Sequence, residues 1–333
     1  MNLTTRYMGL SLRNPLLASA SPLNDDLHNL RALEDAGAAA VVLPSLFVEQ
    51  IEAEDQRHAH LLAVGSHSSP EASGYFPVSR FSGGATERHL ELVRKARAAL
   101  DIPVIASLNA ARLDAWVDYG ALVQEAGASA LELNIYFVAA DITQNAQDVE
   151  GRYLDIVRAV RQRVSIPLAV KLSPYFSSLG AMAVGLGDAG ADALVLFNRF
   201  YQPDIDVLRL AIKTDLEPSQ SVEMRLPLLW LAVLHGRVRP SLAASTGVHT
   251  VEDVVKYLLV GADVVMTTSA LLQKGIGHMR HLVDGLALWL EQREAQSLAS
   301  VRGLLSQGNI SKPEEFERAN YIKILQGYRS GAH

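Results

Sequence analysis

The sequence contains no cysteine among its 333 residues. This absence excludes disulfides, thiolate zinc sites, iron–sulfur ligation by this chain and a cysteine that acts as nucleophile or base. No run of about eighteen apolar residues occurs, so the sequence predicts no membrane span. The first ten residues also lack the basic-then-apolar layout of a signal peptide, and we expect a cytoplasmic protein.

Like charges are also not concentrated anywhere in the sequence. The formal net charge is -6, and no block of like charges occurs along the chain. The basic stripe that meets nucleic acid or anionic lipid is therefore missing. We expect the partner to be a small molecule or another protein, with no nucleic acid and no membrane.

An internal repeat is the most informative feature that is present. Ala-Gly-Ala, preceded by an acidic residue, stands before a short apolar run at 35–43, 125–133 and 188–196, and a related copy covers 260–266. Each copy is typical of a helix that ends at a glycine in the left-handed conformation and is followed by a buried strand. The repeat predicts the second, fourth, sixth and eighth strands of a parallel sheet.

Proline opens a second set of apolar runs, at 102–106, 166–170 and 239–243, and residues 14–18 form another run. Proline stops a preceding helix and is tolerated as the first residue of a strand, so these runs fit the third, fifth, seventh and first strands. Eight strands alternating with segments of helical period predict one α/β domain over residues 1–333, a (β/α)8 TIM barrel. An open doubly wound sheet is the alternative, but the dinucleotide glycine fingerprint is missing.

Three segments are longer than ordinary loops. We expect long loops at about 47–84 and 198–226, and a C-terminal helical extension beyond Ala295. Long insertions at the carboxyl ends of barrel strands often shape an active site, so the first of these loops is a candidate lid.

Polar residues that end the strands of such a barrel point into its site. The sequence places there Ser19, Ser45, Ser107, Asn109, Asn134, Lys171, Asn198, Thr246, Gly247, Thr267, Thr268 and Ser269. The last five follow strands seven and eight, where barrels often hold phosphate. Ordinary helix N-caps are the alternative interpretation of these small polar residues.

Lys171 lies within an apolar strand. A buried ammonium group there needs an anion or an electron-rich ligand atom. A flavin would supply one, because negative charge develops at its pyrimidine end on reduction, and asparagine amides match its donor and acceptor edge. A Schiff-base lysine, as in barrel lyases, and an ordinary ion pair are the alternatives.

Four segments carry a resemblance to a known family. They are Arg13-Asn14-Pro15, Leu131-Glu132-Leu133-Asn134, Val170-Lys171-Leu172-Ser173-Pro174-Tyr175-Phe176 and Leu258-Leu259-Val260-Gly261-Ala262. Across most of the barrel they resemble dihydroorotate dehydrogenase, particularly its soluble class 1. The resemblance implies an FMN-binding barrel that oxidises dihydroorotate to orotate in pyrimidine biosynthesis, and it suggests a homodimer.

The same resemblance implies roles for individual residues. Asn134 and Lys171 would contact the flavin, and Asn109 would join the cofactor contacts. The residues beside the flavin would be Ala18, Ser19, Ala20 and Ser45. The residues that hold its phosphate would be Thr246, Gly247, Thr267, Thr268 and Ser269.

The substrate side departs from the family pattern. The family's loop after strand four reads Asn-x-Ser-Cys-Pro-Asn and carries a cysteine base, but this chain has Phe137 in place of that cysteine. Phenylalanine cannot take a proton. Tyr136 could donate a proton or pack at the barrel rim. Asn198 and the adjacent Arg199 could bind a substrate carboxylate together. The alternative is that Arg199 is solvated or forms an ion pair.

Two main functions follow. The first is an FMN-dependent dehydrogenase that acts on a CH–CH bond of dihydroorotate or a related small molecule, with Lys171, Asn134 and Tyr136 as its catalytic residues. The alternative is a flavin-binding electron-transfer or regulatory subunit without that activity, because the usual base is missing. An electron-acceptor protein on another chain stays open as a partner. We expect no metal, since His58, His60 and His67 complete no recognisable ligand spacing.

Overall fold

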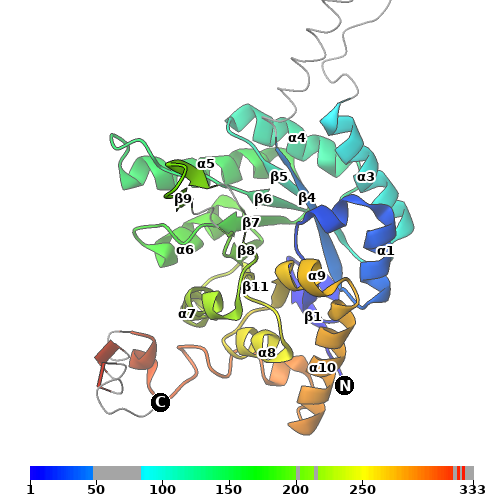
Figure 1. Ribbon diagram of the computed structural model, residues 1–333, viewed down its shortest axis with the longest axis vertical. Helices are drawn as coiled ribbons and strands as arrows, with labels where there is room; N and C mark the ends of the chain where they lie inside the picture. Colours follow the sequence, from blue (N-terminus) through cyan, green and yellow to red (C-terminus); the bar gives the residue numbers. More distant parts are fainter. Residues whose placement is uncertain (48–83, 200–202, 214–216, 318–320, 323–324, 327–333) are drawn as a thin grey trace, which may run out of the picture.

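The structure is a computed structural model that describes residues 1–47, 84–199, 203–213, 217–317, 321–322 and 325–326 (Figure 1). Eight parallel strands close into a barrel in the order β11-β12-β3-β4-β5-β6-β7-β8. These strands are β3 (Leu16–Ala18), β4 (Ala40–Phe47), β5 (Val104–Asn109), β6 (Ala130–Asn134), β7 (Leu168–Leu172), β8 (Ala193–Leu196), β11 (Ser241–Ala244) and β12 (Val264–Thr267). The predicted (β/α)8 barrel is confirmed, and each predicted strand is present.

Helices follow the strands and surround the barrel (Figure 1). They are α1 (Leu27–Asp35), α3 (Ala85–Ala99), α4 (Leu113–Glu125), α5 (Ala146–Arg163), α6 (Leu179–Ala189), α7 (Arg225–Leu234), α8 (Val251–Leu259), the short α9 (Ser269–Lys274) and α10 (His278–Gln292). The repeat glycines have positive φ angles, as expected, for example 110° at Gly190, which caps α6. Helix α5 begins at Ala146, because Asn145 and Asp148 form a capping box at its start.

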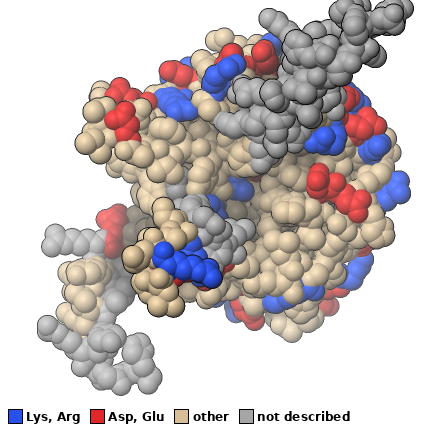
Figure 2. Space-filling model, turned by 45° about the horizontal axis from the view of Figure 1, so that its top comes forward, with Lys and Arg blue, Asp and Glu red and all other residues tan. Residues whose placement is uncertain are grey.

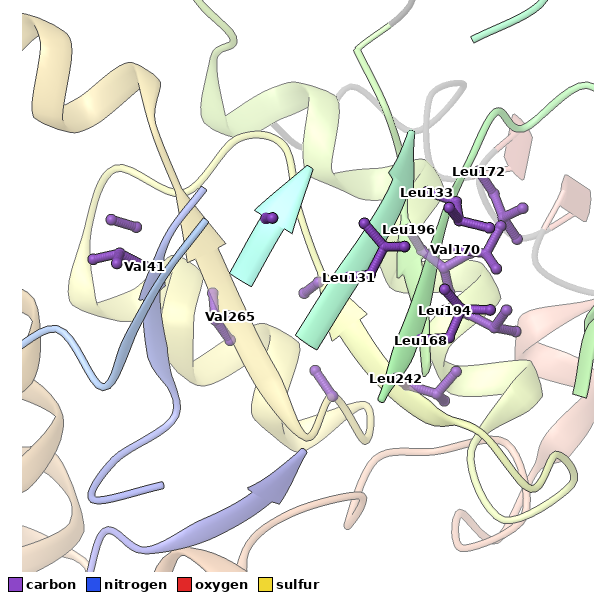
Figure 3. Packing of buried hydrophobic residues seen from close by; sticks show 14 of the residues in the cluster. Val41, Leu131, Leu133, Leu168, Val170, Leu172, Leu194, Leu196, Leu242 and Val265 are labelled. Carbon is purple, nitrogen blue, oxygen red and sulfur yellow. The ribbon is translucent and has the colours of Figure 1, made fainter. Parts of the chain in front are cut away.

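The strands are buried on both faces. Outward-facing leucine and valine side chains such as Leu133, Val170 and Leu196 pack in one cluster with the helices (Figure 3). The inward face carries smaller side chains, including Ala130, Ala169 and Ala193, which form a second cluster. This two-sided burial explains why the strands are short continuous apolar runs.

Two hairpins escaped the sequence prediction. Strands β1 (Thr5–Tyr7) and β2 (Leu10–Leu12) pair antiparallel, and Tyr7 packs with the inward-facing cluster. This hairpin therefore closes the amino-terminal end of the barrel. Strands β9 (Asp204–Asp206) and β10 (Ala211–Lys213) form a second antiparallel hairpin within the predicted long segment 198–226.

The remaining segments are irregular. A 3₁₀ helix, η1 (Pro22–Asp25), precedes α1, and another, η2 (Ser221–Met224), precedes α7. Beyond Ala295 the chain forms turns and two short 3₁₀ helices, η3 (Leu298–Ser300) and η4 (Pro313–Phe316). The candidate lid at 47–84 lies outside the described residues except at its ends. None of the helices described is both long enough and apolar enough to cross a membrane.

Candidate functional site

A pocket opens where the carboxyl ends of β7, β8, β11, β12 and β3 meet, and these five strands are neighbours in the barrel. A space-filling view shows a hollow in one face of the molecule, with Lys or Arg atoms visible inside it (Figure 2). The predicted site residues that line the pocket are Ser19, Ala20, Lys171, Asn198, Arg199, Thr246, Gly247, Thr267, Thr268 and Ser269. The structure thus brings together residues that lie about 250 positions apart along the chain.

Six predicted site residues do not line this pocket, and one of them, Ser107, is fully buried in β5. Ala18 is fully buried and its side chain belongs to the cluster that packs against the helices. Asn109 ends β5, buried and paired in register with Phe47. Ser45 and Asn134 lie on the neighbouring strands β4 and β6, and half-buried Tyr136 follows two residues after Asn134.

Lys171 is the more deeply buried of two cationic residues that line the pocket. Its side chain points inward from β7, and the residue is only 8% exposed. Within the described ranges it has no carboxylate partner within 4.0 Å, so an ordinary ion pair does not account for its burial there. A buried ammonium group without such a partner favours an electron-rich ligand in the pocket.

The turns after β11 and β12 form the opposite wall. Thr246 and Gly247 both have positive φ angles, and the Tyr257 hydroxyl donates to the carbonyl oxygens of Ser245 and Thr246 at 3.2 and 2.7 Å. These bonds fix the turn around the two main-chain amides that follow β11. The turn is therefore built as a rigid polar wall, the kind of surface that barrels use to hold phosphate.

The N-cap interpretation does not describe these hydroxyls. Helix α8 is capped by Thr250, which accepts from the Asp253 amide. Thr267 Oγ1 donates to the Val248 carbonyl at 3.0 Å, and Thr268 Oγ1 donates to the Ser19 carbonyl at 3.3 Å. The threonine hydroxyls instead join the turns after β11, β12 and β3 into one wall.

Sequence reasoning missed a segment that lines the pocket beside this wall, which we call the 217–219 strap (Glu217, Pro218 and Ser219). The Ser219 hydroxyl accepts from the Gly247 amide at 3.2 Å and lies 3.0 Å from the Ser269 hydroxyl. A Cβ at position 247 would lie 2.9 Å from the Gln220 carbonyl oxygen, so only glycine fits under the strap. The strap lies in the irregular segment after β10, where no period or motif marks it.

Arg199 fits both alternatives predicted for it, a position at the ligand site and an ion pair. It lines the pocket, and its Nη2 forms an ion pair with Glu223 at 3.6 Å. Its Nη1 is buried and has no hydrogen-bond partner among the residues that the structure describes. The guanidinium group is therefore held by one carboxylate and keeps a free donor for an anionic ligand group.

A chain of hydrogen bonds runs through the neighbouring strands β4, β5 and β6. Asn198 Nδ2 donates to Asn134 Oδ1 at 2.6 Å, and Asn134 Nδ2 donates to Ser45 Oγ at 3.2 Å. The hydroxyls of Ser45 and Ser107 lie 2.8 Å apart, and Ser107 Oγ donates to Glu132 Oε1 at 3.4 Å. We call these five residues the polar chain; it begins at Asn198 in the pocket and ends inside the barrel.

Glu132 belongs to the segment Leu131-Glu132-Leu133-Asn134 that carries part of the family resemblance, but its burial was not predicted. The residue is 1% exposed, and its Oε2 atom has no partner within the described residues. Burial raises the pKa of Glu132, while Lys171 and the Ser107 hydroxyl act in the opposite direction. Its signal in the sequence is its spacing, since it lies two residues before Asn134 and so on the same face of β6.

The loop after β6 contains no carboxylate or imidazole at the position of the expected base. Phe137 lies under the Arg152 guanidinium group, which is 4.3 Å from its ring centroid. This contact gives Phe137 a packing role. Among the described residues, the polar chain contains the groups best suited to acid–base chemistry, namely the Glu132 carboxyl group and the hydroxyls of Ser45 and Ser107.

The arrangement suits a particular kind of ligand. The turns after β11 and β12 form a polar wall at the place where barrels often hold an anionic group, and Lys171 also lines the pocket. Asn198 and Arg199 add an amide and a guanidinium group. A ligand with an anionic end and a polarisable ring would use both sides of the pocket.

The chain is similar over most of its length to curated proteins of known name. It is 25% identical over 311 residues to the catalytic subunit of dihydroorotate dehydrogenase B (NAD(+)) from Thermoplasma acidophilum, which covers 91% of this chain and 98% of that protein. The same subunit from Pyrococcus furiosus is 24% identical over 91% of this chain and 99% of its own length. The NAD-dependent dihydropyrimidine dehydrogenase subunit PreA from Escherichia coli is 23% identical over 96% of this chain and 80% of its own length. No family model matches the chain.

Proposed function

We propose that this chain, a divergent relative of the dihydroorotate dehydrogenases, is an FMN-dependent oxidoreductase that removes a hydride and a proton from a CH–CH bond of a small molecule. The observation that carries the proposal is Lys171, a buried cation that faces the pocket and forms no ion pair within 4.0 Å with a carboxylate of the described ranges, although its charge acts on the buried Glu132. The turns after β11 and β12, which also line the pocket, lie where barrels often hold phosphate.

The residues present fit FMN. Thr246, Gly247, Thr267, Thr268 and Ser269 would hold its phosphate, and Ser19 and Ala20 would lie along it. When bound, FMN supplies a ring that accepts a hydride. Ala18, Ser45, Asn109 and Asn134 remain proposed neighbours of the ring, although their side chains do not line the pocket.

Lys171 has a clear task in this reaction. Its positive charge would lie where negative charge arrives during hydride transfer, and it would stabilise that charge inside a site of low polarity. Asn134, held by Ser45 and Asn198, would orient the reacting groups as a rigid donor and acceptor. Tyr136 remains a proposed proton donor from the loop above.

The residues proposed to bind the substrate favour an anionic molecule. Arg199 Nη1 is buried without a partner among the described residues, and Asn198 also lines the pocket. A carboxylate would satisfy both groups with charge-assisted hydrogen bonds. Since the relatives are named for dihydroorotate and for a dihydropyrimidine, we propose a small ring of that kind, and dihydroorotate itself, with its place in pyrimidine biosynthesis, is the first candidate.

We further propose a homodimer that passes electrons to another protein. The β9–β10 hairpin presents Ile205, Leu208 and Leu210 at 58%, 93% and 88% exposure. Apolar side chains concentrated at such exposure are typical of an association surface. We assign this hairpin to the second copy of the chain, because Arg209 and Lys213 pair with Asp206 and Asp204 within it, which leaves its exposed apolar side chains to make the contact.

An anaerobic absorbance titration tests the function. The purified chain is loaded with FMN and titrated with dihydroorotate, and separately with dihydrouracil, while the oxidised flavin band is followed. We expect one of the two to bleach the band. A protein that binds no FMN would refute the proposal. Bound flavin that only dithionite reduces would favour a subunit that carries electrons without this activity.

A further inference from the structure

The hydrogen bonds of the polar chain all point in one direction. Asn134 Nδ2 donates to Ser45 Oγ, so the Ser45 hydroxyl proton is left to face Ser107. The Ser107 hydroxyl in turn donates to Glu132 Oε1. Each hydroxyl therefore accepts on the pocket side and donates on the Glu132 side, which is the order that a proton relay toward Glu132 requires.

The carboxyl group at the end of the chain is fully enclosed. Glu132 projects inward from β6, opposite Ser107 in register, and its Oε2 has no partner within the described part of the molecule. Below it the barrel is closed by the β1–β2 hairpin, whose Tyr7 hydroxyl is also buried and unpaired there. Within the described residues, the hydrogen bonds of Glu132 lead to Ser107 and from there to Ser45, at the carboxyl end of β4.

The charges around Glu132 balance it between two protonation states. Burial favours the neutral acid, since an unpaired carboxylate oxygen is costly in the barrel interior. Lys171 on β7 favours the carboxylate, and Tyr7 on β1 also faces this interior, with Asp263 beyond it. A negative charge that arrives beside Lys171 would offset its support for the carboxylate and so favour the acid.

We propose that Glu132 is the proton acceptor of this site, reached through Ser45 and Ser107, and that it takes over the task of the missing base. The proposal rests on the proposed FMN function. FMN, when bound, would accept the hydride of the oxidised CH–CH bond, and the remaining C–H proton would need an acceptor from this chain. Half-buried Ser45 would be the entry point: its Oγ would take that proton as its own passed to Ser107, and the Ser107 proton would pass to Glu132, forming one new O–H bond there as a C=C bond formed in the substrate.

Electrochemical reduction tests this without knowledge of the substrate. The FMN-loaded protein is reduced at an electrode while its infrared difference spectrum is recorded, with and without 13C-labelled glutamate. We expect a protonated carboxyl band that appears on reduction, shifts with the label and is absent in Glu132→Gln. The midpoint potential of that variant should also vary less with pH, by about 30 mV per pH unit, because it takes up one proton fewer per two electrons.

A matched pair of variants tests the relay if Glu132→Gln fails to fold. Ser107→Ala removes the hydroxyl that links Ser45 to Glu132, and Ser107→Thr keeps one. We expect the reduction-linked band to be weaker in Ser107→Ala, because loss of the hydroxyl that stabilises the carboxylate favours the acid before reduction, and to be retained in Ser107→Thr.

The outcomes separate the two proposals. A wild-type chain that binds no FMN removes the proposed function, and this inference falls with it. Bound, reducible FMN without a glutamate band on reduction overturns the role of Glu132 alone, as does a band that persists in Glu132→Gln. Equal bands in Ser107→Ala and Ser107→Thr overturn the relay.

Discussion

His89 makes the stability of this protein sensitive to acid. The residue lies near the start of α3, buried, and its Nε2 has no hydrogen-bond partner among the described residues. Burial lowers the pKa of His89 from 6.5 to about 4. The folded protein therefore holds this imidazole neutral in a pH range where the unfolded chain protonates it.

The expected loss follows from the two pKa values. Between pH 6.5 and about 4 the unfolded state binds more protons at this residue than the folded state, so stability falls as the pH is lowered through that window. Relative to pH 7.5, the free energy of unfolding should be about 2 kcal/mol lower at pH 5. Below the folded pKa the loss should reach about 3 kcal/mol, at 1.36 kcal/mol per pKa unit.

Urea unfolding of wild type and His89→Leu at pH 7.5 and pH 5 measures this. The variant should lose about 2 kcal/mol less than the wild type over that interval, since leucine cannot titrate. His28→Gln is the matched control, because His28 is exposed on α1 and its replacement should leave the pH dependence as it is. Equal pH dependence in wild type and His89→Leu would refute the argument.

Three further predictions concern the pocket and the hairpin. Lys171→Met should weaken FMN binding about ten- to hundredfold, the effect of losing about 1.5–3 kcal/mol from a hydrogen bond to a charged group; fluorescence titration checks this, and unchanged affinity would contradict it. Gly247→Ala should also weaken FMN binding while circular dichroism stays native, because a Cβ there meets the Gln220 carbonyl at 2.9 Å; full affinity would show that the strap yields freely. Replacing Leu208 and Leu210 with serine should halve the mass in light scattering without changing flavin content, and an unchanged dimer would place the interface elsewhere.

The barrel could be predicted because its repeats contain residues that mark where helices end and strands begin. Glycine at the helix ends and proline at the strand starts recur along the chain, and the residues between them are apolar on both strand faces. The β1–β2 and β9–β10 hairpins carry no such signal. Their strands have three residues each, too few for a two-residue period to be recognised.

The pocket could be predicted in part for a similar reason. Lys171, Asn198 and Thr246 each end an apolar strand, and parallel strands bring such ends together. The 217–219 strap could not be found, since its place depends on tertiary contacts with Gly247 and Ser269. The role of Glu132 was hidden because whether a charged residue in a strand faces the interior depends on which face of that strand closes the barrel.

The division of the barrel into two arcs has an evolutionary consequence. Strands β7, β8, β11, β12 and β3 surround the pocket, while β4, β5 and β6 carry Ser45, Ser107, Glu132 and Asn134. Mutations in the loops after β4, β5 and β6 leave most residues that line the pocket in place, so descendants can keep the ligand site and change the reaction. A chimera that receives residues 135–144 from a dihydroorotate dehydrogenase would retrace one such exchange in a single step.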